Sequence, residues 1–361
     1  MFANQPSPRR RNQTLVVVNS LGRQASSLIR VASAVGYTVR GQLRSCTRNK
    51  LLSTELTSLP NVTLIEGSLE DPSFIGELFA GANVAFINTT SWGDEVAIGK
   101  SLAVAAKKAG VKHYIYSSLT DHSTIARQGG PYLDALPLWK TKFEVEKFAR
   151  EIFGLDATFV YAGCYNNNFS SVLPVPMWQL EDNGEGGFLW KAPFHPDYPI
   201  PWLDTEHDVG PAILQILKDG VRKWGGMRIP LAFEVMNPIQ AAEAFTRGLG
   251  RRVTYIQCPL EIDAFPIPQG YRDQLYAAAK LFEDPKNPYF LPGMGERCPD
   301  VARHLWQGWR SLEEYAREVF PVEEKANGAP WILQLLAEEG DLGESFPATP
   351  NNEANGTEVD A

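Results

Sequence analysis

Short apolar runs alternate with helical patterns along the first half of the chain. Runs of strand length occupy residues 14–18, 37–43, 62–66, 83–88, 112–117 and 158–161. Apolar positions with helical spacing occupy residues 24–34, 74–79, 94–109 and 140–153. Because strands that alternate with helices through short connections pair in parallel, this pattern predicts an α/β fold with a Rossmann-type doubly wound parallel sheet.

The second half of the chain differs in composition. Proline and aromatic residues become frequent between residues 174 and 211, and helical patterns follow at 209–217, 239–249, 269–282 and 301–320. The sequence therefore predicts a first domain over residues 14–170 and a smaller α/β second lobe over 171–335, with some helices returning to the first domain. The ends, 1–13 and an acidic tail at 336–361, have little to bury and are expected to be disordered.

The first predicted strand breaks directly into a tight turn and then a helix at residues 19–25. Such a turn presents free backbone N–H groups and the positive end of a helix dipole to a pyrophosphate. The glycine pattern is degenerate, since a GxxGxxG loop would place glycine at all three of the positions held by Asn19, Gly22 and Ala25. Asparagine tolerates positive φ and alanine permits close helix–strand approach, so a dinucleotide loop remains compatible. An ordinary strand–turn–helix unit is equally compatible with these residues alone.

The end of the second predicted strand bears on the choice between NAD and NADP. An acid at this position commonly binds the ribose hydroxyls and repels a 2′-phosphate. The strand ends instead in Leu43, Arg44 and Ser45, so no acid follows it, and Arg44 could pair with a phosphate. A solvated surface arginine is the alternative. Related folds often place an acid after the third strand, where it holds the adenine. In this chain Ser68 follows Gly67 at that point and offers only a hydroxyl.

The helical pattern at 140–153 carries half of a catalytic pair. In short-chain dehydrogenases a tyrosine transfers a proton, and a lysine four residues later lowers the tyrosine pKa and holds the ribose. Lys142 matches the lysine, but Leu138 stands at the tyrosine position and has no proton to give. Ser117 and Ser118, at the end of the fifth strand, are expected to cap the strand and line the cofactor pocket. We therefore expect cofactor binding with no catalytic residue.

Composition narrows the class of protein. The 361-residue chain has a formal net charge of −8, which argues against direct nucleic-acid binding and permits a basic protein partner. Its four cysteines form no CxxC pair, so a reduced compartment, nucleus or cytoplasm, is expected. No apolar run reaches the roughly 18 residues of a membrane span. The adjacent Glu206, His207 and Asp208 diverge on any regular element, so no metal site is expected.

Ten runs of the sequence resemble the NmrA-like family, atypical relatives of the short-chain dehydrogenases that bind dinucleotides as sensors. The runs are residues 17–19, 22–25, 85–91, 113–118, 159–163, 165–169, 201–204, 206–211, 251–255 and 314–321. The resemblance extends over residues 14–331, nearly the whole region expected to fold. The resemblance therefore supports dinucleotide binding strongly, which the loop alone does not.

The resemblance implies that NAD or NADP binds at a defined set of residues. The pyrophosphate would lie on Asn19, Ser20, Leu21, Gly22, Arg23 and Gln24, and the adenosine beside Arg44, Gly67 and Ser68. The far ribose would lie against Asn88, Thr89, Thr90 and Lys142, and the nicotinamide end under Tyr165, Asn166, Asn167 and Asn168. A polar turn is the alternative for the three asparagines. The fungal regulators of this family carry histidine at the position of Arg44, which leaves the preference between NAD and NADP open.

The fungal regulators in this family repress nitrogen genes by binding a GATA-type zinc-finger activator. The resemblance therefore implies a non-catalytic negative transcriptional regulator of nitrogen metabolism that acts in nitrogen metabolite repression, and an acidic chain complements a basic zinc finger. The implied partner contacts are Glu206, Asp208, Gln215 and Leu217. Asp208 could equally cap the helix that begins after it. The alternative function is an NAD(P)H-dependent reductase of the atypical short-chain dehydrogenase class, with Tyr165 as the proton donor to test.

Overall fold

The computed structural model describes residues 13–47, 49–90, 93–127, 131–170, 176–263 and 269–327. The tails expected at 1–13 and 336–361 therefore lie outside the described residues, except for Gln13. Within the described ranges no helix is both long enough and apolar enough to span a bilayer.

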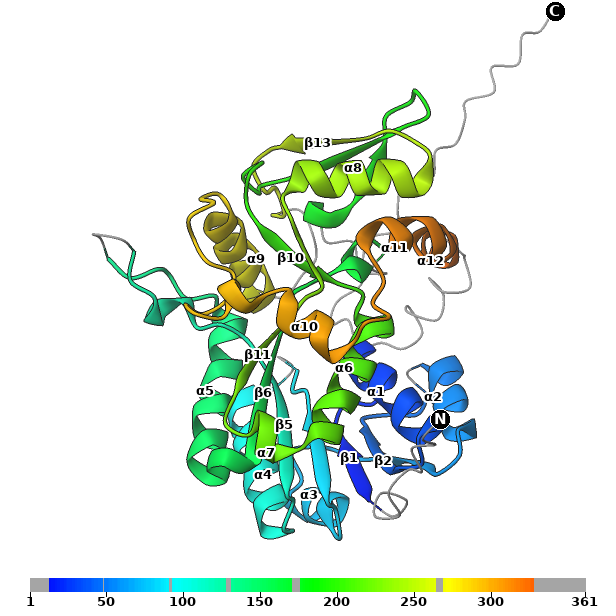
Figure 1. Cartoon of the computed structure of the whole chain (residues 1–361), viewed down its shortest axis with the longest axis vertical. Helices are drawn as coiled ribbons and strands as arrows, with labels where there is room; N and C mark the ends of the chain where they lie inside the picture. The colour runs from blue at the N-terminus through cyan, green and yellow to red at the C-terminus, as the bar shows by residue number, and fades with distance from the viewer. Residues whose placement is uncertain are drawn as a thin grey trace, which may run out of the picture.

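A seven-stranded sheet occupies the lower half of the molecule (Figure 1). Its strands are β1 (Thr14–Val17), β2 (Thr38–Leu43), β3 (Val62–Glu66), β4 (Val84–Ile87), β5 (His113–Ser118), β6 (Ala157–Ala162) and β11 (Arg228–Leu231). They lie in the order β11-β6-β5-β4-β1-β2-β3, and every neighbouring pair is parallel. The strand order reverses between β1 and β4, which confirms the predicted doubly wound sheet. Ligands of such sheets bind beyond the carboxyl ends of the strands at this reversal.

Helices cover both faces of this sheet, which is why its strands read as continuous apolar runs. Val16 packs into the layer of α3 (Pro72–Phe79), α4 (Glu95–Lys108) and α5 (Pro137–Phe153). Val17 packs into the opposite layer, which contains α1 (Arg23–Ala34) and α6 (Thr205–Asp219). Strand β11 thus forms one edge of the first sheet, and helix α6 covers one of its faces, although both come after residue 171 in the chain.

The upper half of the molecule contains two three-stranded sheets (Figure 1). One has the order β12-β10-β7 and the other β13-β9-β8. Their strands are β7 (Cys164–Tyr165), β8 (Leu180–Asp182), β9 (Phe188–Ala192), β10 (Ile200–Leu203), β12 (Glu234–Met236) and β13 (Val253–Gln257). Phe169 contacts the rings of Trp190 and Trp202 with centroids 5.0 and 5.7 Å apart. The aromatic residues that mark this part of the sequence therefore form the core of the smaller lobe.

Three of the four helices predicted after residue 200 are confirmed: the one at 209–217 is part of α6, and the next two are α8 (Pro238–Leu249) and α9 (Gln269–Phe282). The single helix predicted at 301–320 is wrong. The chain instead forms α10 (Asp300–Leu305), α11 (Leu312–Glu318) and α12 (Phe320–Asn327). The backbone N–H of Arg310, between α10 and α11, donates to the distant Asp208 carboxylate at 3.2 Å, and Ser311 then starts α11 with a capping box. The helices α2 (Lys50–Ser58) and α7 (Val221–Trp224) have no counterpart in the prediction.

Two buried histidines make the stability of this fold depend on pH. The His113 Nε2 lies 2.8 Å from Thr158 Oγ1, and the His122 Nε2 lies 2.9 Å from the carbonyl oxygen of Pro288. Burial lowers the pKa of each imidazole to about 4. In each case the folded-state pKa lies below the unfolded value of about 6.5. The neutral imidazole therefore contributes its full stabilisation above pH 6.5, and this contribution is lost as the pH falls towards 4.

The substitution His122→Gln should flatten the acid side of the stability profile. Glutamine can still donate to the Pro288 carbonyl but does not titrate. Between pH 7 and pH 4 the wild-type free energy of unfolding should fall by up to about 3 kcal/mol more than that of the variant. Urea denaturation across this range measures the difference, with the exposed His304→Gln as control. Parallel profiles for His122→Gln and wild type would contradict the prediction.

Candidate functional site

The loop after β1 adopts the conformation that a dinucleotide loop requires. Asn19 has φ +56°, in the left-handed region that asparagine tolerates. Its side-chain Nδ2 donates to the carbonyl oxygen of Asn88 at 2.7 Å, and its backbone N–H donates to Gln42 Oε1 at 3.0 Å. Asparagine therefore takes the conformation of a glycine and also ties the end of β1 to the end of β4.

Helix α1 begins at this loop without a side-chain cap. Gly22 is its N-cap residue, and the first turn contains no acid. The first N–H groups of a helix have no partner within it, so those of α1 are available to a ligand. A Cβ at Gly22 would lie 3.2 Å from the carbonyl oxygen of Asn19, which is close even for a small side chain. Leu21 is half-buried in the turn, whereas Ser20 is buried and donates its N–H to the Gln42 carbonyl oxygen at 2.8 Å.

Gln42, which sequence reasoning missed, links this loop to the end of β3. Its Nε2 donates to the carbonyl oxygen of Gly67 at 2.9 Å, while its Oε1 accepts from Asn19. A Cβ at Gly67 would lie within 2.5 Å of the Phe74 ring, so a larger residue there would displace this half-buried side chain. Ser68 is exposed in the next turn, and Arg44 is exposed after β2. The residues expected to hold the adenosine thus follow adjacent parallel strands at the same edge of the sheet.

Lys142 lies in a buried polar network at the end of β4. Its Nζ donates to the Thr89 carbonyl oxygen at 2.5 Å and to Glu95 Oε1 at 2.9 Å. The Glu95 carboxylate also accepts from the hydroxyls of Thr89 and Thr141, each at 2.7 Å. Burial opposes ionisation of Glu95, but the Lys142 ammonium and these hydroxyls together lower its pKa. The charge of Lys142 is therefore compensated within the protein, by an acid that no sequence motif indicated.

The remaining residues of the predicted ribose site surround this network. Asn88 Oδ1 lies 3.4 Å from Lys142 Nζ, and Thr90 is half-buried after Thr89. Leu138 is half-buried one helical turn before Lys142, and its backbone N–H donates to Gln274 Oε1 at 2.9 Å. A hydrocarbon side chain, which has no proton to donate, thus lies four residues before Lys142.

The segment after β7 lies against the start of α1. Gln24 Nε2 donates to the hydroxyl of Tyr165 at 2.5 Å, so the predicted pyrophosphate loop and the predicted nicotinamide-end loop touch. Asn167 Oδ1 accepts from the Thr205 N–H at 3.0 Å, and Asn168 Nδ2 lies 3.6 Å from Cys164 Sγ. The three asparagines form a 3-10 turn that includes Asn166. The three asparagines therefore lie in a turn, directly after the tyrosine that contacts the loop.

Several buried polar atoms in this region have no hydrogen-bond partner in the described part of the chain. They are Gln24 Oε1, Asn166 Oδ1 and Nδ2, Asn167 Nδ2 and Thr205 Oγ1. Buried polar atoms in proteins are nearly always paired with protein or water, so a group of orphans fits a polar ligand. Within the described ranges no three His, Cys, Asp or Glu side chains gather as metal ligands.

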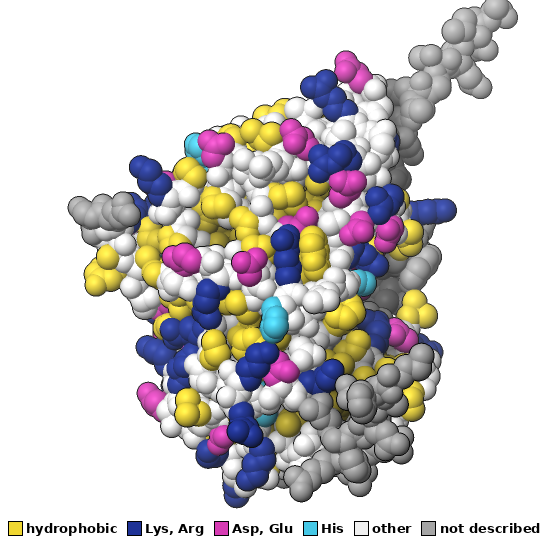
Figure 2. Space-filling view, viewed as in Figure 1, with side chains coloured by type: hydrophobic (Ala, Val, Ile, Leu, Met, Phe, Trp, Pro, Cys, Tyr) yellow, Lys and Arg dark blue, Asp and Glu magenta, His cyan; other side chains and the backbone are white. Residues whose placement is uncertain are grey.

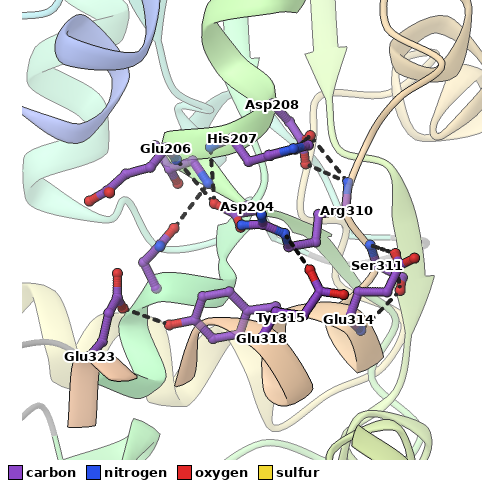
Figure 3. A network of polar contacts seen from close by, with 12 residues as sticks. Asp204, Glu206, His207, Asp208, Arg310, Ser311, Glu314, Tyr315, Glu318 and Glu323 are labelled. Atoms are coloured by element: carbon purple, nitrogen blue, oxygen red, sulfur yellow. Dashed lines mark hydrogen bonds and ion pairs between the residues drawn. The ribbon is translucent and has the colours of Figure 1, made fainter. Parts of the chain in front are cut away.

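A second polar network surrounds the start of α6 (Figure 3). Asp204 is the N-cap, because its Oδ1 accepts from the N–H groups of Glu206 and His207 at 3.2 and 3.1 Å. The alternative that Asp208 caps the helix is therefore wrong. Asp208 is fully buried and accepts from Trp306 Nε1 and the Arg310 N–H, both at 3.2 Å. Burial raises the pKa of Asp208, although the His207 imidazole at 2.6 Å acts in the opposite direction.

The four residues expected to contact a partner differ in exposure. Asp208 and Leu217 are buried, Leu217 in the core beneath α6. Their expected direct contact with a partner is therefore corrected: both support α6 from inside. Gln215 is half-buried and donates to Asp219, whereas Glu206 is exposed and pairs with Arg23 at 2.7 Å. Glu206 is thus the exposed one of the four, and it lies next to the loop at the start of α1.

The doubly wound parallel sheet and the loop between β1 and α1 define a protein with a Rossmann-type fold. The chain belongs to the NmrA-like family, whose model matches residues 11–316. It is 51% identical to the nitrogen metabolite repression protein nmrA of Emericella nidulans, over 89% of this chain and 99% of that protein. It is 48% identical to the nitrogen metabolite repression protein nmr of Neurospora crassa, over 92% of this chain and 73% of that protein.

Crystal structures of NmrA, described as a negative transcriptional regulator, have the same fold. The NmrA chain in the complex with NADP is 53% identical in sequence to this chain. The two structures superpose with a TM-score of 0.81 over 90% of this chain and 100% of that one. The complex with NAD is 54% identical, with a TM-score of 0.82 over the same shares of the two chains. These similarities confirm the family resemblance found in the sequence.

Proposed function

We propose that the protein is a negative transcriptional regulator of nitrogen metabolism that acts in nitrogen metabolite repression. It binds NAD or NADP without turning it over and represses a GATA-type zinc-finger activator by binding it. The observation that carries the proposal is the identity of 51% to a nitrogen metabolite repression protein along almost the full length of both chains. The proposed site of action is the nucleus, with a further pool in the cytoplasm.

The geometry of the loop supports cofactor binding at the carboxyl edge of the sheet. The uncapped start of α1 suits a pyrophosphate, and the orphaned atoms of Gln24, Asn166 and Asn167 suit the polar nicotinamide end. NmrA has been crystallised with NAD and with NADP, which supports the same ligands here. The bound dinucleotide would supply redox chemistry only if a proton donor and a substrate were also present.

The surroundings of Lys142 support binding without turnover. Leu138 replaces the phenol, and Glu95 compensates the charge with which the lysine would lower the pKa of such a phenol. Lys142 Nζ donates to the Thr89 carbonyl oxygen and to Glu95 at short distances, whereas Asn88 Oδ1 lies 3.4 Å away. The donor that faces Asn88 would turn to a ribose hydroxyl when the cofactor binds. In this role Lys142 is a positioning residue.

We expect titration calorimetry to detect binding of NAD or NADP, while reduced cofactor stays unoxidised in the presence of quinones, aldehydes and imines. Comparison of oxidised and reduced forms also tests the sensor role, because a ligand pair that binds equally well shifts no equilibrium. Steady oxidation that is abolished by Lys142→Ala and by Tyr165→Phe would contradict the proposal. It would favour the reductase alternative, since burial raises the pKa of Tyr165 and keeps its proton available.

A pull-down with a GATA-type zinc-finger fragment tests the proposed partner. The formal net charge of −8 suits a basic protein better than nucleic acid. The upper part of the face in Figure 2 carries acidic and basic side chains side by side. Binding should weaken as salt is added, and Glu206→Gln should weaken it further, whereas Glu283→Gln on an exposed site after α9 should not. Absence of binding at low salt would contradict the proposal.

A further inference from the structure

A carboxylate lies beside the end of β2 although no acid follows that strand in the sequence. Glu66 is the last residue of β3 and is the register partner of Leu43, the last residue of β2. Its Oε2 accepts a hydrogen bond from the backbone N–H of Cys46 at 2.9 Å. Since parallel neighbours end at the same edge of a sheet, β3 supplies the loop after β2 with an acid that β2 itself lacks.

The loop that this carboxylate contacts is held in place by two further hydrogen bonds. Ser53 Oγ of α2 donates to the Cys46 carbonyl oxygen at 2.8 Å, so the loop is held from the side opposite Glu66. The Gly67 N–H donates to the Leu43 carbonyl oxygen at 3.0 Å and holds the two strand ends together. Hydrogen bonds from the backbone and thiol of Cys46 keep the pKa of Glu66 below its usual range, so the group is charged at neutral pH.

We propose that Glu66 determines dinucleotide specificity by selecting against the 2′-phosphate of NADP. The inference rests on the proposed cofactor site, in which the adenosine ribose lies at the end of β2. A 2′-phosphate would bring up to two negative charges close to the Glu66 carboxylate, whereas the 2′-hydroxyl of NAD brings none. Arg44 and Lys50, both exposed near this loop, attract the same phosphate. The affinity for NADP therefore depends on two opposing effects, attraction of the 2′-phosphate by these cations and its repulsion by Glu66.

The test is titration calorimetry of the full chain with NAD and NADP, for wild type and Glu66→Gln, at low and at high ionic strength. Glutamine keeps an oxygen that can accept from the Cys46 N–H and removes only the charge. At low salt the NADP affinity of the variant should rise about three- to tenfold while the NAD affinity stays within about twofold, and the difference should shrink at high salt. Glu77→Gln is the matched control, because it removes the same charge from the last turn of α3, which runs away from this edge.

The two possible failures are distinguishable. If both dinucleotides bind and the ratio of their affinities is the same for Glu66→Gln, Glu77→Gln and wild type, the assignment of Glu66 is overturned while the proposed cofactor site stands. If neither dinucleotide binds the folded wild-type protein, the proposed cofactor site is overturned and the assignment of Glu66 with it. A rise in NADP affinity that Glu77→Gln reproduces would show an effect of net charge and would also overturn the assignment.

Discussion

Replacing Gly210 with alanine should lower the free energy of unfolding by about 3 kcal/mol. Gly210 lies in α6 where this helix packs on α1, and a Cβ there would lie 2.4 Å from the carbonyl carbon and oxygen of Ser27. Backbone atoms cannot rotate aside as a flexible side chain can, so α6 must move away from α1. This shift would loosen the buried contacts of Val209 and Ile213 and break the hydrogen bond of 2.9 Å from the Gly210 N–H to Ser27 Oγ.

Chemical denaturation of Gly210→Ala beside Gly76→Ala measures this effect against a matched control. Gly76 lies inside α3, and a Cβ there would meet nothing within 4 Å. Alanine has the higher helix propensity, so Gly76→Ala should be neutral or stabilise by up to about 1 kcal/mol. An equal response of the two variants would mean that α1 and α6 do not require close approach.

The second large effect is expected from Lys142→Met, which should cost about 3 to 5 kcal/mol. The substitution leaves the Glu95 carboxylate, at the start of α4, buried without its cation. Only 3% of the Glu95 side chain is exposed. In the wild type the pKa of Glu95 is lowered, so its contribution is present above the unfolded value of about 4.5 and is lost as the pH falls below it. The cost of Lys142→Met should therefore be largest near neutral pH.

The double variant Glu95→Gln/Lys142→Met separates the charge pair from simple loss of packing. Removing both charges together should recover about 2 kcal/mol of the sum of the single effects, measured by urea denaturation in a double-mutant cycle. The exposed pair Lys280–Asp134, at 2.6 Å with both side chains 67% exposed, is the control. Its removal should cost less than about 1 kcal/mol. Additive single effects at Glu95 and Lys142 would contradict a buried coupled pair.

The sheet could be predicted because its strands are buried on both faces. Val16 and Val17 face opposite helical layers, so β1 is apolar from Leu15 onwards, and the run is too short for a helix. Asn19 could be assigned to a turn for a local reason as well, since asparagine adopts the positive φ that the structure has at this position. Strand length, side-chain type and turn chemistry were sufficient for these features.

The parts of the candidate site that could not be predicted depend on contacts between distant segments. Gln42 and Glu66 act on loops that follow neighbouring strands, and Glu95 meets Lys142 only when α4 packs beside α5. The register of β2 and β3 would have revealed Glu66, but register is not a property of either strand alone. The same physical reason explains the broken helix at 301–320, because the Asp208 carboxylate that binds the Arg310 N–H is far away in the sequence.

The return of α6 and β11 to the first sheet means that the dinucleotide loop cannot be isolated by cutting the chain in two. A fragment that ended at residue 170 would lack α6, and the apolar side chains of Leu28 and Ile29 on α1 would lose that cover. Such a fragment should aggregate rather than fold as an autonomous unit. Limited proteolysis should accordingly leave the two halves associated, and a macromolecule that binds α6 would bind the same cooperative folding unit that holds the loop.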